Sequence, residues 1–367
     1  MLFDTLQVGR LALPNRILLA PLTRARSDLA HMPNDLMAEY YAQRASGGLL
    51  ITECTMVAPH TSAFVTEPGI YSPEQVAAWK KVTDAVHAKG GRIFMQIWHS
   101  GRAAHPAMND GAENVGPSAI AIDGEVHTPQ GKLPNAKPRA LTLEEIPGMV
   151  QAYVQGAKNA IEAGFDGVEV HGANGYLIDQ FLRNSANQRT DAYGGSLENR
   201  ARFLFDVLTA VTAAIGADRV GLRLSPLNSY NSMIDSDPLA LIGYLADKLN
   251  AFNLAYLHVM RSDFFQQQAA DVMPVARANY KGVLIGNMGY SAEEAEQAIA
   301  AGQLDAVAFG TAFLANPDLP ERIQAGAELN APNPATFYTP GAVGYTDYPT
   351  MAEKTTNTNT NAGTATA

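Results

Sequence analysis

Cysteine and charged residues are scarce in this chain of 367 residues. Its one cysteine, Cys54, excludes an intramolecular disulfide and a cysteine-ligated iron–sulfur cluster, which needs about four thiolates. Lysine and arginine number 26 against 36 aspartates and glutamates, and the resulting net charge of −10 disfavours a nucleic-acid partner. The chain has no run of about eighteen apolar residues and no signal-peptide pattern at residues 1–5. We therefore expect a cytoplasmic protein without a membrane segment.

Hydrophobic residues are abundant, at 47% of the chain, and they fall into short apolar runs that alternate with helical patterns. Eight such alternations without an internal sequence repeat predict an α/β fold, a single (β/α)8 TIM barrel over residues 1–353. The predicted strands are residues 15–20, 49–53, 92–97, 165–170, 219–224, 254–259, 283–285 and 305–309.

Residues typical of helix starts lie between these predicted strands. Ser72 can cap a helix in which Pro73 takes the first position and Gln75 closes a capping box. The same signals predict helices that open at Thr142, whose box is closed by Glu145, and at Ser291. Further helices are predicted at residues 34–45, 197–215 and 238–250.

Three segments do not fit the alternation. Residues 2–14 contain Gly9 and Pro14 and are predicted to form a hairpin across the bottom of the barrel. Residues 100–141, after the third strand, are rich in proline, glycine and asparagine, and so long a connection predicts an insertion that forms a lid. Residues 354–367 are almost entirely small or polar and predict a disordered tail.

Isolated polar or glycine residues stand at the carboxyl ends of five predicted strands: Thr23, Gln96, His171, Arg223 and Gly310. In a parallel barrel these ends share one rim, where active sites lie. Each residue alone has a structural reading, such as a turn residue, a strand-end amide or a surface ion pair. Together on one rim they favour a bound polar ligand.

The segment that begins at His171 adds two more polar side chains, those of Asn174 and Tyr176. A strand end followed by a turn could bring this imidazole, amide and phenol to one spot. The triplet by itself is equally compatible with a hydrogen-bonded histidine at a strand end and a half-buried tyrosine.

Longer motifs extend over most of the chain. They include QIWHSGR from Gln96, HGANGYLIDQFL from His171, QRTDAYGGSLENR from Gln188, LRLSP from Leu222, ANPDL from Ala315 and GYTDYP from Gly344. In these motifs, over residues 2–349, the chain resembles the Old Yellow Enzyme family of flavin-dependent ene-reductases. The resemblance implies a monomer or weak homo-oligomer with non-covalent FMN, NADPH or NADH as hydride donor, and an α,β-unsaturated carbonyl, nitroalkene or maleimide as substrate.

The resemblance also implies a role for each candidate residue. His171 and Asn174 would donate hydrogen bonds to the substrate oxygen, and Tyr176 would protonate its Cα. Thr23, Gln96 and Arg223 would contact the flavin ring, Arg223 beside N1 and O2, where reduced flavin carries negative charge. The other implied cofactor-binding residues are Pro21, Leu22 and Cys54 at the ring, and Asn287, Met288, Gly289, Gly310 and Thr311 at the phosphate. The candidate walls of the substrate pocket are Phe64, Trp98, Phe264 or Phe265, and Tyr338, and no metal site is expected.

One position departs from the family pattern. Where the family usually has an arginine that contacts the FMN phosphate, this chain has Thr311, and Lys281 is a candidate for the replacement cation. Two other functions stay open. One is a flavin-free lyase or aldolase in which Arg223 holds a substrate carboxylate, although no lysine stands at a predicted strand end for Schiff-base chemistry. The other is a flavin-binding protein without turnover.

Overall fold

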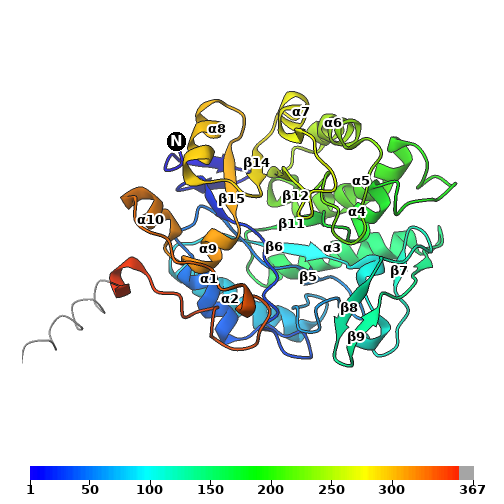
Figure 1. Cartoon of the computed structure of the whole chain (residues 1–367), viewed down its shortest axis with the longest axis horizontal. Helices are drawn as coiled ribbons and strands as arrows, with labels where there is room; N and C mark the ends of the chain where they lie inside the picture. The colour runs from blue at the N-terminus through cyan, green and yellow to red at the C-terminus, as the bar shows by residue number, and fades with distance from the viewer. Residues whose placement is uncertain (355–367) are drawn as a thin grey trace, which may run out of the picture.

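A closed barrel of parallel strands forms the centre of the computed structural model, which describes residues 1–354 (Figure 1). Pairing of β15 with β3 and of β6 with β11 closes the ring. The eight strands are β3 (Ile17–Leu19), β4 (Leu50–Ile51), β6 (Ile93–Trp98), β11 (Gly167–Gly172), β12 (Val220–Leu224), β13 (Tyr256–Met260), β14 (Leu284–Asn287) and β15 (Ala306–Phe309). The predicted (β/α)8 barrel is therefore confirmed.

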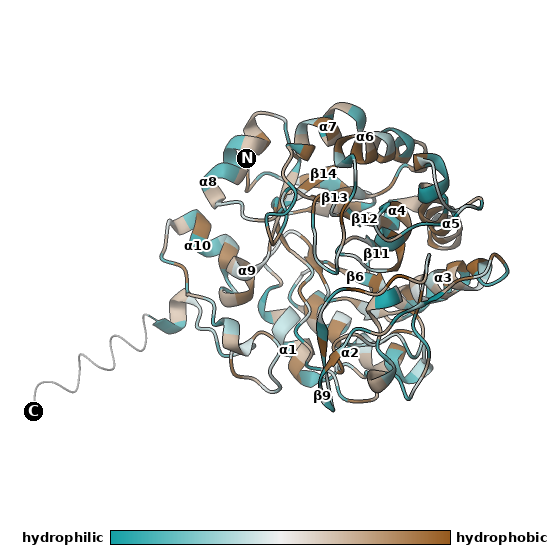
Figure 2. Cartoon of the chain, turned by 45° about the vertical axis from the view of Figure 1, so that its right-hand side comes forward, coloured by the Kyte–Doolittle hydropathy of each residue, from teal (hydrophilic) through white to brown (hydrophobic). Residues whose placement is uncertain are grey.

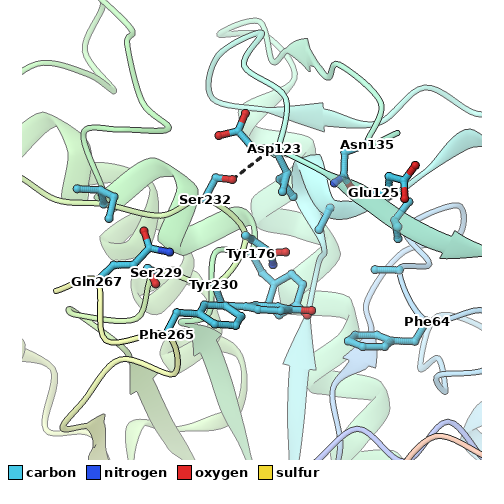
Figure 3. Close-up of a pocket in the computed structure, with 16 residues that line it drawn as sticks. Phe64, Asp123, Glu125, Asn135, Tyr176, Ser229, Tyr230, Ser232, Phe265 and Gln267 are labelled. Atoms are coloured by element: carbon cyan, nitrogen blue, oxygen red, sulfur yellow. Dashed lines mark hydrogen bonds between the residues drawn. The ribbon is translucent and has the colours of Figure 1, made fainter. Parts of the chain in front are cut away.

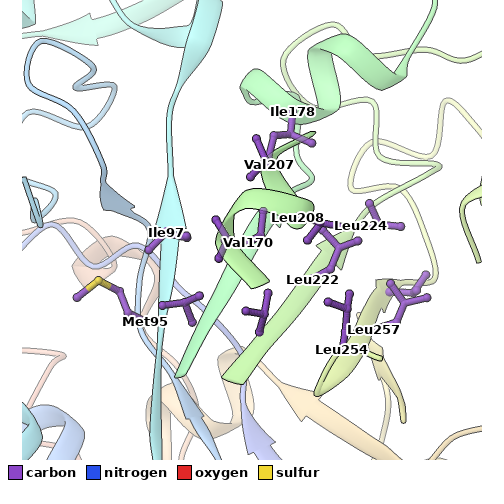
Figure 4. Close-up of a cluster of buried hydrophobic side chains, with 14 of the residues drawn as sticks. Met95, Ile97, Val170, Ile178, Val207, Leu208, Leu222, Leu224, Leu254 and Leu257 are labelled. Atoms are coloured by element: carbon purple, nitrogen blue, oxygen red, sulfur yellow. The ribbon is translucent and has the colours of Figure 1, made fainter. Parts of the chain in front are cut away.

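Side chains alternate between the two faces of each strand, because successive residues in a strand point in opposite directions. On β11, Val168 and Val170 belong to the large core between the strands and the helices. Figure 4 shows this core around Val170 and Leu222. Glu169 and His171 take the other face and point into the barrel, although all four side chains are buried. A polar layer therefore lies inside the barrel.

Below that layer, a second apolar core fills the amino-terminal end of the barrel. It contains Phe94 and Tyr256 from the strands, with their rings 5.8 Å apart. Val8 and Leu13 close it from an antiparallel hairpin of β1 (Leu6–Val8) and β2 (Leu11–Leu13). This packing leaves the opposite, carboxyl end of the barrel for a site.

The helices surround the strands, and hydrophilic residues lie mainly on their outer faces (Figure 2). The capping box at Ser72 and the cap at Ser291 are present, and the helix predicted at 197–215 has those bounds. The outer helices are α1 (Asp35–Gln43), α2 (Pro73–Ala88), α3 (Ile146–Glu162), α5 (Leu197–Ile215), α6 (Pro238–Leu249), α7 (Val272–Asn279), α8 (Ala292–Ala300) and α10 (Leu319–Ala325). No helix within residues 1–354 is long and apolar enough to cross a membrane.

Two sequence predictions were wrong in detail, and four helices were missed. The helix expected at Thr142 begins at Ile146, because Pro147 has no N–H to bond the carbonyl of Leu143. Glu145 still accepts a hydrogen bond from the backbone N–H of Thr142, at 2.8 Å. The fourth strand lies two residues later than predicted, so His171 is inside it. The helices α4 (Leu177–Leu182), α7, α9 (Thr311–Ala315) and α10 were not predicted.

The insertion at residues 100–141 has more order than its composition indicated. Its centre is an antiparallel hairpin of β8 (Glu125–Thr128) and β9 (Gly131–Pro134). Its two ends pair in parallel as β7 (Val115–Gly116) and β10 (Arg139–Ala140). The predicted tail begins at Lys354, which closes a helical turn at residues 351–354, and its remaining residues, 355–367, lie outside the described part of the chain.

Candidate active site

A cavity of about 650 Å³ opens at the carboxyl ends of the barrel strands. All the candidate catalytic and cofactor-binding residues line it, although they come from seven separate segments of the chain. These are Pro21, Leu22, Thr23, Cys54, Gln96, His171, Asn174, Tyr176, Arg223, Asn287, Met288, Gly289, Gly310 and Thr311. Among residues 1–354 no lysine lines the cavity, so a Schiff-base lyase or aldolase lacks its nucleophile here.

His171 lies beside Arg223 in the register of β11 and β12, and both side chains are at least nine-tenths buried. The Nδ1 atom of His171 has no hydrogen-bond partner among the described residues. Burial, with the positive charge of Arg223 nearby, lowers the pKa of His171 well below its usual 6.5. The imidazole is therefore neutral at physiological pH and carries one proton that can be donated to a ligand.

Asn174 is held in a left-handed backbone conformation, with φ of 58°. Its backbone N–H donates to Ser225 Oγ at 2.7 Å, and its side-chain Oδ1 accepts from Asn228 Nδ2 at 2.9 Å. Since Asn228 occupies the carbonyl end of the amide, the NH2 end is left to donate to a ligand. Asn228 is fully buried, and no sequence motif had identified this supporting residue.

Tyr176 follows the turn and is 5% exposed. Burial raises the pKa of its phenol well above the usual value, so the hydroxyl keeps its proton at neutral pH. Its ring packs edge-on against Trp98, with centroids 5.0 Å apart. Trp98 itself is fully buried and is not among the residues that line these cavities, so its role as a pocket wall stays a prediction. As an inward residue at the end of β6 it lies behind Tyr176 and supports that ring.

Glu169, which sequence analysis missed, organises the polar layer beneath the cavity. It is fully buried and accepts hydrogen bonds from Gln96 Nε2 at 2.8 Å, from Tyr256 Oη at 3.1 Å and from His258 Nδ1 at 2.8 Å. Burial opposes its ionisation, but His258, Arg223 and these hydrogen bonds outweigh burial and lower its pKa. The alternation of β11 could have revealed it, because Glu169 shares the inward face with His171.

The flavin-ring candidates make contacts that fix their orientation. Gln96 donates its amide to Glu169, which leaves its carbonyl oxygen free to accept from a ligand. Arg223 Nη2 donates to Asn287 Oδ1 at 2.8 Å, while its Nε has no partner within the described chain. Thr23 Oγ1 lies 3.1 Å from Cys54 Sγ, and burial raises the pKa of that thiol. Cys54 is therefore a neutral thiol at the cavity surface.

Arg261, which the sequence analysis also missed, lies next to a turn at Met288 and Gly289 at one end of the cavity. Its Nε donates to the Met288 carbonyl at 2.8 Å and its Nη2 to the Gly289 carbonyl at 3.0 Å, while both Nη atoms bond Glu294. Its guanidinium carbon lies 3.7 Å from the centre of the Tyr290 ring. Met288 has a φ of 86° and Gly289 a φ of 72°, so this turn is in a conformation that favours glycine.

Because the C=O and the following N–H of a trans peptide point in opposite directions, Arg261 turns the N–H groups of Gly289 and Tyr290 away from itself. Neither N–H has an acceptor among the residues that the structure describes. Lys281 is not the replacement cation: it precedes β14, at the other end of the strand from Gly289, and donates to the carbonyl of Ala278. The cation near this turn is Arg261.

Aromatic side chains form the outer wall of the cavity. Phe64 and Tyr338 stack with centroids 6.0 Å apart, and Phe264 and Phe265 both line the opening. Tyr230, which was not predicted, also lines it and lies next to the Tyr176 hydroxyl. Tyr338, Phe264 and Phe265 are between 48% and 61% exposed, an apolar rim suited to a ligand.

A rim at the carboxyl end of a parallel barrel with a buried arginine for a negatively charged cofactor ring and free backbone amides for a phosphate suits a flavin-dependent oxidoreductase. The sequence profile of the NADH:flavin oxidoreductase / NADH oxidase family matches residues 1–330. The chain is therefore a member of this family, to which the Old Yellow Enzymes belong.

Individual relatives match nearly the whole chain. A probable flavin mononucleotide-dependent alkene reductase of Leishmania infantum is 53% identical over 358 residues, which are 96% of this chain and 98% of the relative. The solved structure of the old yellow enzyme from Trypanosoma cruzi has a TM-score of 0.93 at 46% identity and covers 95% of this chain and 98% of its own. Morphinone reductase gives a TM-score of 0.92 at 46% identity, with coverage of 96% and 97%.

Proposed function

We propose that this chain is an FMN-dependent ene-reductase that uses NADH or NADPH to reduce activated alkenes. The observation that carries the proposal is the pair of oriented donors, the neutral imidazole of His171 and the amide of Asn174, on one wall of the cavity. The relatives described as an alkene reductase and as an old yellow enzyme support it. FMN, when bound, supplies hydride transfer from the reduced nicotinamide to the alkene.

The donor set in the cavity fits FMN. Arg223 is a buried cation with an unpaired Nε, suited to the negative charge that reduced flavin carries near N1 and O2. Gln96 offers a carbonyl oxygen to a ring N–H, and Thr23 a hydroxyl to a ring carbonyl. Pro21, Leu22 and Cys54 give the ring an apolar surface. These roles follow from the chemistry of each group.

The substrate end of the cavity has donors for one oxygen atom. His171 and Asn174 would hydrogen-bond the carbonyl or nitro oxygen of the alkene, and these bonds strengthen as negative charge builds there during attack on Cβ. Tyr176, which keeps its proton at neutral pH, would then protonate Cα. The insertion at residues 100–141 would act as a lid, since several of its side chains face a cavity that adjoins this end.

The function can be tested by following the flavin bands under anaerobic conditions. We expect yellow protein that NADH or NADPH bleaches and that an α,β-unsaturated ketone such as 2-cyclohexenone recolours. Protein without flavin bands even after FMN is added would overturn the proposal. Flavin that binds but is not bleached by either nicotinamide would indicate a binding protein without turnover. The same experiment ranks NADH against NADPH.

At the phosphate end, we propose that Arg261 replaces the arginine that the family usually has at position 311. It would act by positioning: it holds the carbonyls of Met288 and Gly289, so that two N–H groups face the phosphate. We expect Arg261→Gln to raise the dissociation constant of FMN about ten- to a hundredfold, since hydrogen bonds to a charged group contribute about 1.5–3 kcal/mol. Riboflavin, which lacks the phosphate, should bind this variant and the unmodified chain alike.

Fluorescence quenching with both flavins measures these constants. Lys281→Gln is the matched control, because Lys281 lies at the other end of β14 and should change neither constant. Thr311→Arg should tighten FMN but not riboflavin if the phosphate lies beside Gly310. If Arg261→Gln raised the dissociation constants of both flavins equally, Arg261 would have only a structural role in the turn.

A further inference from the structure

A second cavity, of about 490 Å³, adjoins the first (Figure 3). The two cavities share four aromatic residues in their linings: Phe64, Tyr176, Tyr230 and Phe265. The rest of the second lining comes mainly from the insertion and from the loop after β12. These residues are Ala63, Ala103, Ile122, Asp123, Glu125, Val126, Asn135, Ser229, Asn231, Ser232, Ile234 and Gln267.

One side of this second cavity is aromatic. Figure 3 shows the rings of Phe64, Tyr176, Tyr230 and Phe265 along one side of this pocket, and the same four residues also line the first cavity. Tyr230 and Phe265 stack, with ring centroids 6.3 Å apart and planes inclined by 24°. A substituent that leaves the first cavity past Tyr176 would therefore pass between ring faces, which attract cations as well as apolar groups.

The opposite side is polar and acidic. Asp123 and Glu125 lie there, and no basic nitrogen in residues 1–354 is within ion-pair distance of either carboxylate. The backbone N–H of Asp123 donates to Ser232 Oγ at 3.0 Å, which ties the insertion to the loop after β12 (Figure 3). The described residues thus leave both carboxylates free for a ligand.

Arg102 is a cation that interacts electrostatically with Asp123, but it does not cancel this charge by direct contact. Arg102 is 1% exposed, and its Nη groups donate to the backbone carbonyls of Ile120, Asn231 and Ser232 behind the cavity wall. Burial lowers the pKa of Arg102 to about 10, and the negative charge of Asp123 raises that pKa only from a distance. The surface that a ligand meets is therefore aromatic on one side and anionic on the other.

We propose that the second cavity holds the distal end of an extended alkene substrate and selects a positively charged ammonium group there. This inference rests on the proposed ene-reductase function and names its substrate class. An ammonium group is attracted both by aromatic faces and by two unpaired carboxylates. A carboxylate at the same place would meet two like charges without a basic partner. The reduced alkene would stay near His171, and the tail would lie past Tyr176.

Three β-nitrostyrenes test this. Each carries a methylene group at the para position of its ring, and that methylene bears a trimethylammonium, a hydroxyl or a carboxylate group. The methylene weakens the electronic effect of each end group on the alkene, and the spread that remains from this cause is measured in the double variant described below. The quaternary ammonium cannot add to the alkene. Each kcat/KM is divided by the value for unsubstituted β-nitrostyrene with the same protein. We expect this normalised kcat/KM to fall in the order ammonium, hydroxyl, carboxylate. The ratio between the first and the last should be about tenfold or more at low ionic strength and should shrink as salt is added.

The double variant Asp123→Asn, Glu125→Gln should narrow this spread to about twofold. Glu113→Gln is the matched control, because Glu113 lies in the same insertion but pairs with Arg139 and lines neither cavity, so the spread should persist. Equal normalised rates for the three tails in the unmodified chain would overturn the inference, as would a spread that survives in the double variant. A chain that fails to reduce the unsubstituted compound would instead contradict the proposed function.

Discussion

Tyr176→Phe is expected to slow the reduction of an α,β-unsaturated ketone by about a hundredfold or more, because a general acid contributes about 10²–10⁴ in rate. Phenylalanine keeps the edge-on packing against Trp98, so the cavity should retain its shape. Reduction of FMN by NADH or NADPH should be nearly unchanged, since that half-reaction needs no acid. The rate of nitroalkene reduction should fall less, because the nitro group stabilises the carbanion without a proton.

Rapid-mixing measurements of the two half-reactions separate these outcomes. Equal damage to both would contradict the acid role of Tyr176. Tyr230→Phe is the informative companion variant, because its hydroxyl lies next to that of Tyr176. A larger loss in Tyr230→Phe than in Tyr176→Phe, for the ketone alone, would assign the acid to Tyr230.

Loss of either donor to the substrate oxygen is the second large effect. His171→Ala and Asn174→Ala should each cost about 1.5–3 kcal/mol of transition-state stabilisation, or about ten- to a hundredfold in the oxidative half-reaction. The rate of the reductive half-reaction should fall as well if, as we propose, the nicotinamide occupies the same cavity as the substrate. Asn228→Ala should act in the same direction by a smaller factor, since it frees the amide of Asn174 to turn. Rates unchanged in both half-reactions would remove these residues from the site.

The protonation state of His171 adds a check by pH. Burial lowers the pKa of His171 well below 6.5, so the imidazole is already neutral at pH 6 and stays neutral at higher pH. The oxidative rate should therefore show no histidine titration between about pH 6 and 8. An inflection near 6.5 that disappears in His171→Ala would contradict the neutral donor.

Most of the fold could be predicted because its signals are local. The capping box at Ser72 and the cap at Ser291 depend on residues three or fewer positions apart, and both are present. The prediction failed where a local signal was overruled, as at Pro147, or was too short to recognise, as in α4 and α9. The strand-end rule and the motifs named candidate residues that the fold brings to one cavity. Trp98 is packed behind Tyr176 instead, because an inward strand position can also serve packing.

The sequence by itself determined which side chains stand at the ends of the strands and, by the parallel topology they imply, that these side chains share one rim. Only the tertiary structure decided how they are held. Glu169, Asn228 and Arg261 act through contacts with residues between 27 and 89 positions away, and such contacts have no periodic trace in the sequence. The protonation of His171 and Tyr176 is likewise set by burial, which depends on the whole packed surroundings rather than on neighbours in the chain.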